Sequence, residues 1–208
     1  MIRSIYYEGE LALDQKSMRK RIVLKRGESL LPIMTWSTGQ REFMPLLLGL
    51  YWLMPSSKIS KKKELQWVVV EEPEMGLHPE AIQAFLLLVL EMMRRGYKIL
   101  ISTHSPLVLD LVWTLRNLKA EGASEEPLFR LFQVKKTPRL REIFRDVLQN
   151  RSIKTFFFRR EGTAGAVIED ISELDPYSER EFEADWGGLT AFTSRSSEVL
   201  SEFFATIE

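Results

Sequence analysis

Three short segments carry residue types that could take part in chemistry. Glu71-Glu72-Pro73-Glu74 and Ser102-Thr103-His104-Ser105 each follow an apolar run, and Trp36-Ser37-Thr38-Gly39-Gln40 precedes one. Carboxylates suit a hard cation such as Mg²⁺, and a remaining carboxylate could act as a general base. A serine and a glycine that open a helix leave backbone N–H groups free at its positive end, which suits a phosphate.

Each segment alone also has a purely structural explanation. Acidic turns are common, a single histidine is more often structural than catalytic, and serine is an ordinary N-cap. A zinc hydrolase using His78, His104 and Glu74 is a further alternative, although the chain has only 2 histidines and no His-Glu-x-x-His pattern. The chemical interpretation therefore depends on whether the fold brings the segments together.

The order of elements predicts where the acidic and histidine segments lie. Residues 65–70 and 97–101 are apolar runs without alternation, typical of strands buried on both faces of a parallel sheet. Active sites of such sheets lie just beyond the carboxyl ends of the strands. If the two strands are neighbours, we expect Glu71, Glu72 and His104 to share one crevice.

Helices are expected around these strands. Ser37 or Thr38 is expected to cap a helix over about residues 39–54, in which Pro45 predicts a kink or a late start. The other expected elements are helices at 79–95, 106–119 and 138–150, strands at 21–25 and 154–160, and turns with short helices over 170–208. The phenylalanine run 156–158 is expected to be buried in its strand rather than to stack on bases.

The alternation of helix and strand in the middle of the chain predicts an α/β fold. We expect a mainly parallel sheet flanked by helices, with residues 1–119 as the core portion and residues 120–208 as an irregular α+β extension of the same domain. The chain has 208 residues and no cysteine, which excludes disulfides and cysteine nucleophiles and fits a cytoplasmic protein.

The charge balance and hydropathy exclude some partners. Lys+Arg and Asp+Glu are both 29, so no net charge drives the chain toward nucleic acid or a membrane surface. The longest apolar run, residues 43–54, is well short of the roughly 20 residues that a membrane-spanning helix needs. We therefore expect no membrane partner.

Taken together, the three segments resemble the ABC-type and AAA-type core ATPases of the P-loop NTPase superfamily, including the overcoming-lysogenization-defect (OLD) group. Residues 36–40 resemble the signature motif, residues 68–72 a Walker B strand with its catalytic glutamate, residues 73–79 the D-loop, and residues 102–106 the histidine switch. The resemblance is specific from about residue 35 to residue 112. It is weaker after residue 119.

The resemblance implies a role for each site residue. Glu72 would polarise the attacking water, Glu71 would hold the Mg²⁺ shell, and His104 would hydrogen-bond and sense the γ-phosphate. Since two heads of this family close around two ATP molecules, the signature motif would reach the nucleotide held by the opposite protomer. The motif residues concerned are Ser37, Thr38, Gly39 and Gln40.

Two features depart from the family pattern. Glu71 stands where Walker B usually has aspartate, but a glutamate can still hold Mg²⁺-bound water. No P-loop, Gly-x-x-x-x-Gly-Lys-[Ser/Thr], is found, because none of the 11 glycines is followed by lysine. The chain therefore resembles the C-terminal half of such an ATPase. Alone, we expect it not to hydrolyse ATP and to associate through the open edge of strand 97–101, unless residues 2–7 or 21–25 cover that edge.

The resemblance implies ATP and Mg²⁺ as cofactors in a DNA-repair or phage-defence type ATPase. Its partner would be a second copy of the chain or a P-loop-bearing chain, and DNA would be contacted through the complete assembly. The alternative, from another class, is a non-catalytic regulatory partner that keeps the signature helix and docks on a complete ATPase. An upstream reading frame that encodes the P-loop half would favour the enzyme.

Overall fold

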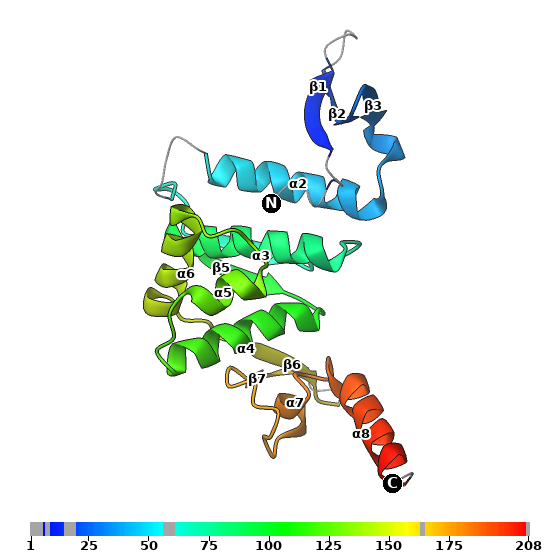
Figure 1. Cartoon of the computed structure of the whole chain (residues 1–208), viewed down its shortest axis with the longest axis vertical. Helices are drawn as coiled ribbons and strands as arrows, with labels where there is room; N and C mark the ends of the chain where they lie inside the picture. The colour runs from blue at the N-terminus through cyan, green and yellow to red at the C-terminus, as the bar shows by residue number, and fades with distance from the viewer. Residues whose placement is uncertain (1–5, 7–8, 15–19, 56–60, 163–164, 207–208) are drawn as a thin grey trace. The chain divides into compact units, whose positions relative to one another are not determined.

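The structure is a computed structural model that describes all residues except 1–5, 7–8, 15–19, 56–60, 163–164 and 207–208 (Figure 1). The chain divides into two units. The first contains Met1–Thr103 and Leu128–Phe144, and the second contains His104–Pro127 and Arg145–Glu208.

A three-stranded antiparallel sheet opens the first unit, in the order β1 (Glu10–Asp14), β2 (Arg21–Arg26) and β3 (Ser29–Pro32). Gly27 has a φ of 59° in the tight turn between β2 and β3, a conformation that glycine adopts without steric cost. A short 3₁₀ turn, η1 (Ile33–Thr35), then leads to the signature segment. The strand predicted at 21–25 is confirmed.

The middle of the first unit is helix, strand, helix, strand. These elements are α2 (Thr38–Leu53), β4 (Trp67–Glu71), α3 (Pro79–Arg94) and β5 (Lys98–Ser102). β4 and β5 pair in parallel with Glu71 opposite Ser102, which confirms that the two strands are neighbours. α2 begins at Thr38 and continues through Pro45, so of the two predicted effects of this proline the late start is excluded and the kink stays a prediction.

The β4–β5 pair is covered on one face only. α3 contacts β5, and Val70 is buried, whereas Val69 and Leu100 pair in register on the opposite face and are 62% and 56% exposed. The prediction of strands buried on both faces is therefore wrong within the described residues. The apolar runs are typical of a parallel sheet that is covered on both faces, but the described residues cover only one face.

The sheets are also smaller and less parallel than expected. Of the three sheets that the described residues form, β4–β5 is parallel, whereas β1–β2–β3 and β6–β7 are antiparallel. β2 belongs to the first of these sheets and does not pair with β5. The other proposed cover for that edge, residues 2–7, lies outside the described residues apart from Tyr6.

The second unit contains most of the remaining helices and a β-hairpin. The elements that follow β5 are α4 (Pro106–Ala120), α5 (Glu126–Leu131), α6 (Pro138–Asn150), β6 (Phe156–Arg160), β7 (Ala166–Asp170), α7 (Glu181–Ala184) and α8 (Ala191–Ala205). α5 and α6 have residues in both units. A cluster of Leu109, Ile171, Leu174 and Trp186 forms part of the core of the second unit.

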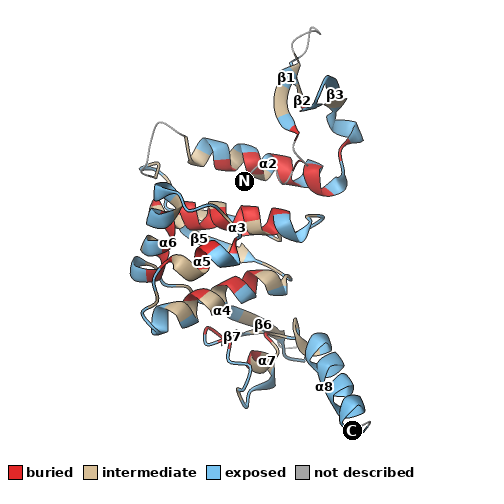
Figure 2. Ribbon diagram, in the orientation of Figure 1, coloured by how far each residue is buried: buried red, intermediate tan, exposed pale blue. Residues whose placement is uncertain are grey.

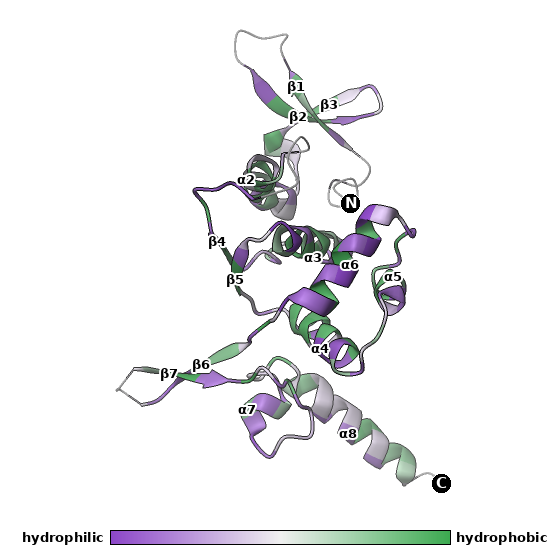
Figure 3. Ribbon diagram, turned by 90° about the vertical axis from the view of Figure 1, so that its left-hand side faces the viewer, coloured by the Kyte–Doolittle hydropathy of each residue, from purple (hydrophilic) through white to green (hydrophobic). Residues whose placement is uncertain are grey.

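Two expectations for this unit are wrong. α8 is a helix of 15 residues where we expected only turns and short helices, because its serine-rich composition hides the helical period. Phe156 and Phe158 are exposed rather than buried, and they alternate along β6 with the partly buried Phe157. Figure 3 shows the hairpin that β6 and β7 form. No helix in the described part of the chain is long and apolar enough to cross a membrane.

A buried carboxylate fastens α3 within the first unit. Glu91 accepts hydrogen bonds from Arg95 Nε at 2.7 Å, Arg94 Nε at 2.8 Å and Arg139 Nη2 at 3.0 Å. Burial raises the pKa of the Glu91 carboxyl, but the three guanidinium groups outweigh burial and lower that pKa to about 2. Arg95 also donates to the carbonyl of Pro55, so the cluster connects α3, α6 and the segment after α2.

Replacing Glu91 with glutamine should lower the free energy of unfolding by about 3 kcal/mol at pH 7, because the buried guanidinium group of Arg95 loses its counter-charge. The contribution of the ionised Glu91 carboxylate to the free energy of unfolding is fully present above the usual pKa of 4.5. This contribution is lost as pH falls toward the folded-state pKa of about 2. Urea unfolding should therefore show a wild-type advantage at pH 7 that shrinks at pH 3. Glu142→Gln is the control, since Glu142 is exposed and 3.9 Å from Arg94. Equal effects of the two changes would contradict this assignment.

Candidate functional site

The carboxyl ends of β4 and β5 hold the acidic segment next to the start of the histidine segment. Glu71 lies opposite Ser102 in register, and the Glu72 N–H donates to the Ser102 carbonyl at 2.9 Å. Glu71 is exposed and Glu72 is half-buried. The parallel pairing thus brings both glutamates to the strand ends where α/β active sites lie.

The backbone turns sharply at Glu72. Glu72 has a φ of 42°, which is uncommon for a residue other than glycine and is enriched at functional sites. The Met75 N–H closes the turn on the Glu72 carbonyl at 3.1 Å, and Thr103 Oγ1 donates to Glu74 Oε1 at 2.7 Å. The loop after β4 is therefore fixed to the residue that follows β5, and the direction in which Glu72 leaves the strand is fixed with it.

Ser37 begins the helix of the signature segment, as predicted. Its hydroxyl accepts from the Gln40 N–H at 3.3 Å, and Gln40 Oε1 accepts from the Ser37 N–H at 3.1 Å. This reciprocal pair is a capping box. Ser37 and Thr38 are exposed at the helix N-terminus, whereas Gly39 and Gln40 are buried. The Gln40 side chain thus serves the helix cap here.

Aromatic residues support the same helix start. Trp36 is buried, donates from Nε1 to the Leu31 carbonyl at 3.0 Å and packs edge-on against Tyr6 with 5.6 Å between ring centroids. Tyr6 is itself buried, and burial raises the pKa of its hydroxyl to about 12. These contacts fasten the N-terminus of α2 to the chain that precedes it.

The signature segment and the D-loop-like segment meet at two glycines. A Cβ added to Gly39 would lie 1.9 Å from the Gly76 carbonyl oxygen, and one added to Gly76 would lie 3.0 Å from the Gly39 Cα and N. Gly76 also has a φ of +67°. Only glycine therefore fits either position, and the backbones of the two segments are in close contact. No local pattern in the sequence reveals this contact, because the two glycines are far apart along the chain.

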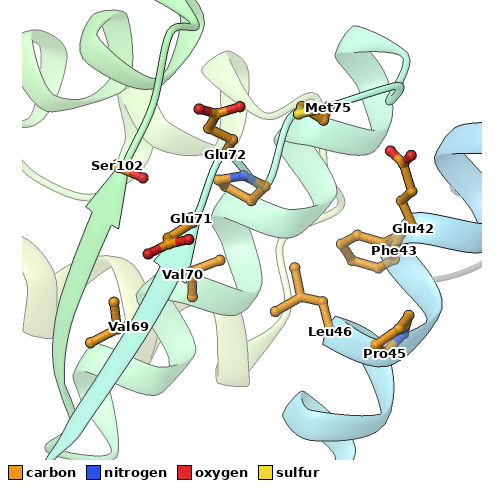
Figure 4. Close-up of a pocket in the computed structure, with 11 residues that line it drawn as sticks. Glu42, Phe43, Pro45, Leu46, Val69, Val70, Glu71, Glu72, Met75 and Ser102 are labelled. Atoms are coloured by element: carbon orange, nitrogen blue, oxygen red, sulfur yellow. The ribbon is translucent and has the colours of Figure 1, made fainter.

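A hollow of about 690 Å³ lies between α2 and the end of β4 (Figure 4). Glu71, Glu72 and Ser102 line it from the strand ends, and Glu42 faces it from α2. The remaining lining residues are Phe43, Pro45, Leu46, Val69, Val70, Pro73 and Met75. Sequence reasoning did not select Glu42 or the apolar wall, whose only signal was their place on the expected helix.

The other site residues lie outside this lining. Ser37 to Gln40 are at the N-terminus of α2, and His104 is the first residue of the second unit. The sharing of one crevice by Glu72 and His104 stays a prediction. His78 is the N-cap of α3, with Nδ1 accepting from the Glu80 N–H at 3.4 Å. Across the residues that the structure describes, no three His, Cys, Asp or Glu side chains gather to hold a metal, so the zinc alternative has no support.

The side chains that line the hollow suit the water of a nucleotide site and the hydration shell of its cation better than they suit the phosphates. Its described lining has three carboxylates and no cationic side chain. Carboxylates can orient water and the hydration shell of Mg²⁺, and one of them can accept a proton. A triphosphate would meet only negative charge there, so its phosphates need cationic or N–H donors from elsewhere. Because the described carboxylates do not gather as a direct metal site, the lining suits the water of a phosphoryl-transfer site and the hydration shell of a cation rather than direct metal ligation.

Parallel strands with acidic carboxyl ends stand at the place where α/β domains bind ligands. Residues 8–110 match the sequence model of the family described as "AAA domain, putative AbiEii toxin, Type IV TA system". The match supports an AAA-type P-loop NTPase domain, and with it an ATPase-like, nucleotide-binding function. Searches of the curated proteins and of the solved structures found no match.

Proposed function

We propose that this chain supplies the hydrolytic half of an ABC-type ATPase of the OLD-like group. The loop that binds the phosphates, termed the phosphate cradle, comes from a P-loop-bearing chain. The observation that carries the proposal is the pairing of β4 with β5, which puts Glu71 and Glu72 at the carboxyl end of a parallel sheet. ATP with Mg²⁺ supplies the phosphoryl group that water attacks.

Each candidate site residue of this chain has a separate role in the proposed reaction. Glu72 accepts the proton of the attacking water, and the turn at φ 42° directs it away from the strand. Glu71 orients the water shell of Mg²⁺. His104, two residues beyond β5, hydrogen-bonds the γ-phosphate. Ser37, Thr38 and Gly39 present the positive end of α2 to the nucleotide of an opposite protomer, while Gln40 keeps that helix end capped.

Two features of the first unit support a partner that brings the P-loop. The outer face of the β4–β5 pair exposes Val69 and Leu100, and no described strand pairs with the other edge of β5. An open apolar edge is a template for a further strand. The acidic lining of the hollow lacks the cations that phosphates need. A P-loop strand beside β5 would satisfy both.

The physiological setting that we propose is a DNA-repair or phage-defence type ATPase in the cytoplasm, with DNA contacted through the complete assembly. The alternative is a regulatory chain that docks on a complete ATPase without hydrolysing ATP. Its supporting observation is the acidic hollow, which by itself has no phosphate cradle. ATP turnover that requires Glu72 would distinguish the hydrolytic half of an ATPase from a regulatory chain.

The shared-site arrangement can be tested at Ser37. In the protein joined to a P-loop half, Ser37→Arg should abolish ATP-dependent dimerisation, because the arginine fills the space where the opposite γ-phosphate must sit. The measurement is light scattering after size exclusion, with and without ATP and Mg²⁺. Ser37→Ala is the control: it removes the same cap, at about 1 kcal/mol, but adds no bulk. ATP-dependent dimerisation that persists in Ser37→Arg would contradict the shared site.

A further inference from the structure

The C-terminal helix α8 has no buried face within the second unit as the structure describes it. None of its residues is buried, and Phe192, Phe203 and Phe204 are 78%, 58% and 61% exposed (Figure 2). At about 200 Å² for a phenylalanine, these three side chains alone expose about 400 Å² of apolar surface. That area is comparable to the largest apolar patch on a typical monomer, and such patches are often functional.

The apolar residues of α8 follow a coiled-coil spacing. Phe192, Ser196, Val199 and Phe203 are separated by steps of four, three and four residues, so they form one stripe along the helix. Leu200 borders this stripe on one side. Arg195 and Glu202, one heptad apart, border it on the other. A stripe with charged residues on its flank is typical of a surface that pairs with another helix.

The charges on the flank select the orientation of such a pair. In an antiparallel pair of identical helices each flank meets the same flank of its partner, whereas in a parallel pair it meets the opposite flank. An antiparallel pair therefore places Arg195 of each copy opposite Glu202 of the other copy. A parallel pair would place both charges against the uncharged flank that carries Leu200. The charge pattern is complementary only to an antiparallel copy of itself.

The apolar layers fit the same register. The register that pairs Arg195 with Glu202 puts Phe192 of one copy against Phe203 of the other, and Ser196 against Val199. The same register brings Leu200 of each copy near Thr193 of the other. Large side chains thus meet at both ends, and the small Ser196 leaves room for close approach at the centre.

We propose that α8 is a self-association helix, through which two copies of this chain pair in the antiparallel register just described. The pair is expected to be weak, because two helices of 15 residues bury less than the standard interface of about 1,600 Å². The proposal is independent of the nucleotide site and of any association through the β5 edge.

Cysteine cross-linking tests the register directly, because the chain has no cysteine of its own. A mixture of Phe192→Cys and Phe203→Cys chains should form a disulfide-linked dimer on mild oxidation, whereas each variant alone should not. In the antiparallel register, like positions lie more than about 15 Å apart, too far for a disulfide. Self-linking of either variant would indicate a parallel pair. The absence of a link in the mixture would show that the helices do not pair in the proposed register. Either result would overturn the proposal.

Charge reversal tests the same pair by affinity. Glu202→Arg should raise the dissociation constant measured by sedimentation about tenfold at low salt, because it turns two attractive pairs into repulsive ones. The control, Glu198→Arg, makes the same charge change on the same helix but away from the stripe, and should leave the constant unchanged. Adding Arg195→Glu to Glu202→Arg should restore the pairing. Equal constants for the two single variants, or no rescue, would overturn the proposal.

Discussion

Replacing Glu72 with glutamine should lower ATP turnover of the protein joined to its P-loop half by about 10²–10⁴-fold, while ATP stays bound. The amide keeps the size and shape of the side chain but cannot accept the proton of the attacking water. Phosphate release gives the turnover, and retention of a fluorescent ATP analogue gives the binding.

The matched control is Glu42→Gln, because Glu42 faces the same hollow from α2 and loses the same charge. We expect Glu42→Gln to change turnover less than about tenfold, since a residue that only shapes the local field contributes less than the base. Loss of ATP binding rather than turnover in Glu72→Gln would make Glu72 a structural residue. Unchanged turnover would place the base elsewhere.

Replacing Gly39 with alanine should lower the free energy of unfolding of the chain by about 3 kcal/mol, the upper range for overpacking. The added Cβ would lie 1.9 Å from the Gly76 carbonyl oxygen, which is backbone and cannot rotate away. Either α2 or the D-loop-like segment must shift. Urea unfolding measures the stability, and a shifted loop should also weaken the turnover of the joined protein.

Gly49→Ala is the control for this substitution, because Gly49 lies in the same helix with nothing within 4 Å of its Cβ position. It should stabilise the chain by about 0.5–1 kcal/mol, since alanine favours a helix interior over glycine. The glycine-to-alanine substitution should therefore change the free energy of unfolding in opposite directions at two positions of one helix. A stabilising Gly39→Ala would mean that the two glycines are not in contact.

The sequence predicted the parts of the site that depend on local patterns. Apolar runs ending in Glu71 and Ser102 predicted β4 and β5, and their parallel pairing is confirmed. Ser37, followed three residues later by Gln40, is a local capping signal, and the structure shows both hydrogen bonds of the capping box. The AAA-type match over residues 8–110 supports a domain of the P-loop NTPase type, and the individual motifs stay predictions.

The features that depend on distant packing could not be predicted. The exposed side of β4 and β5 reads as buried in the sequence, because an apolar run does not say whether the covering layer is present. The contact between Gly39 and Gly76 and the cluster around Glu91 each join residues that are far apart in sequence. α8 was missed because its apolar stripe is interrupted by Ser196.

The central claim is that the ends of β4 and β5 supply the hydrolytic half of an ATPase whose phosphate cradle comes from a partner. The most direct measurement is phosphate release from ATP with Mg²⁺ by the chain alone and by the chain joined, ahead of Met1, to the P-loop half of an AAA-type ATPase. We predict no release above background for the chain alone and steady turnover for the joined protein. Turnover by the chain alone, or a joined protein that binds ATP without hydrolysing it, would contradict the claim.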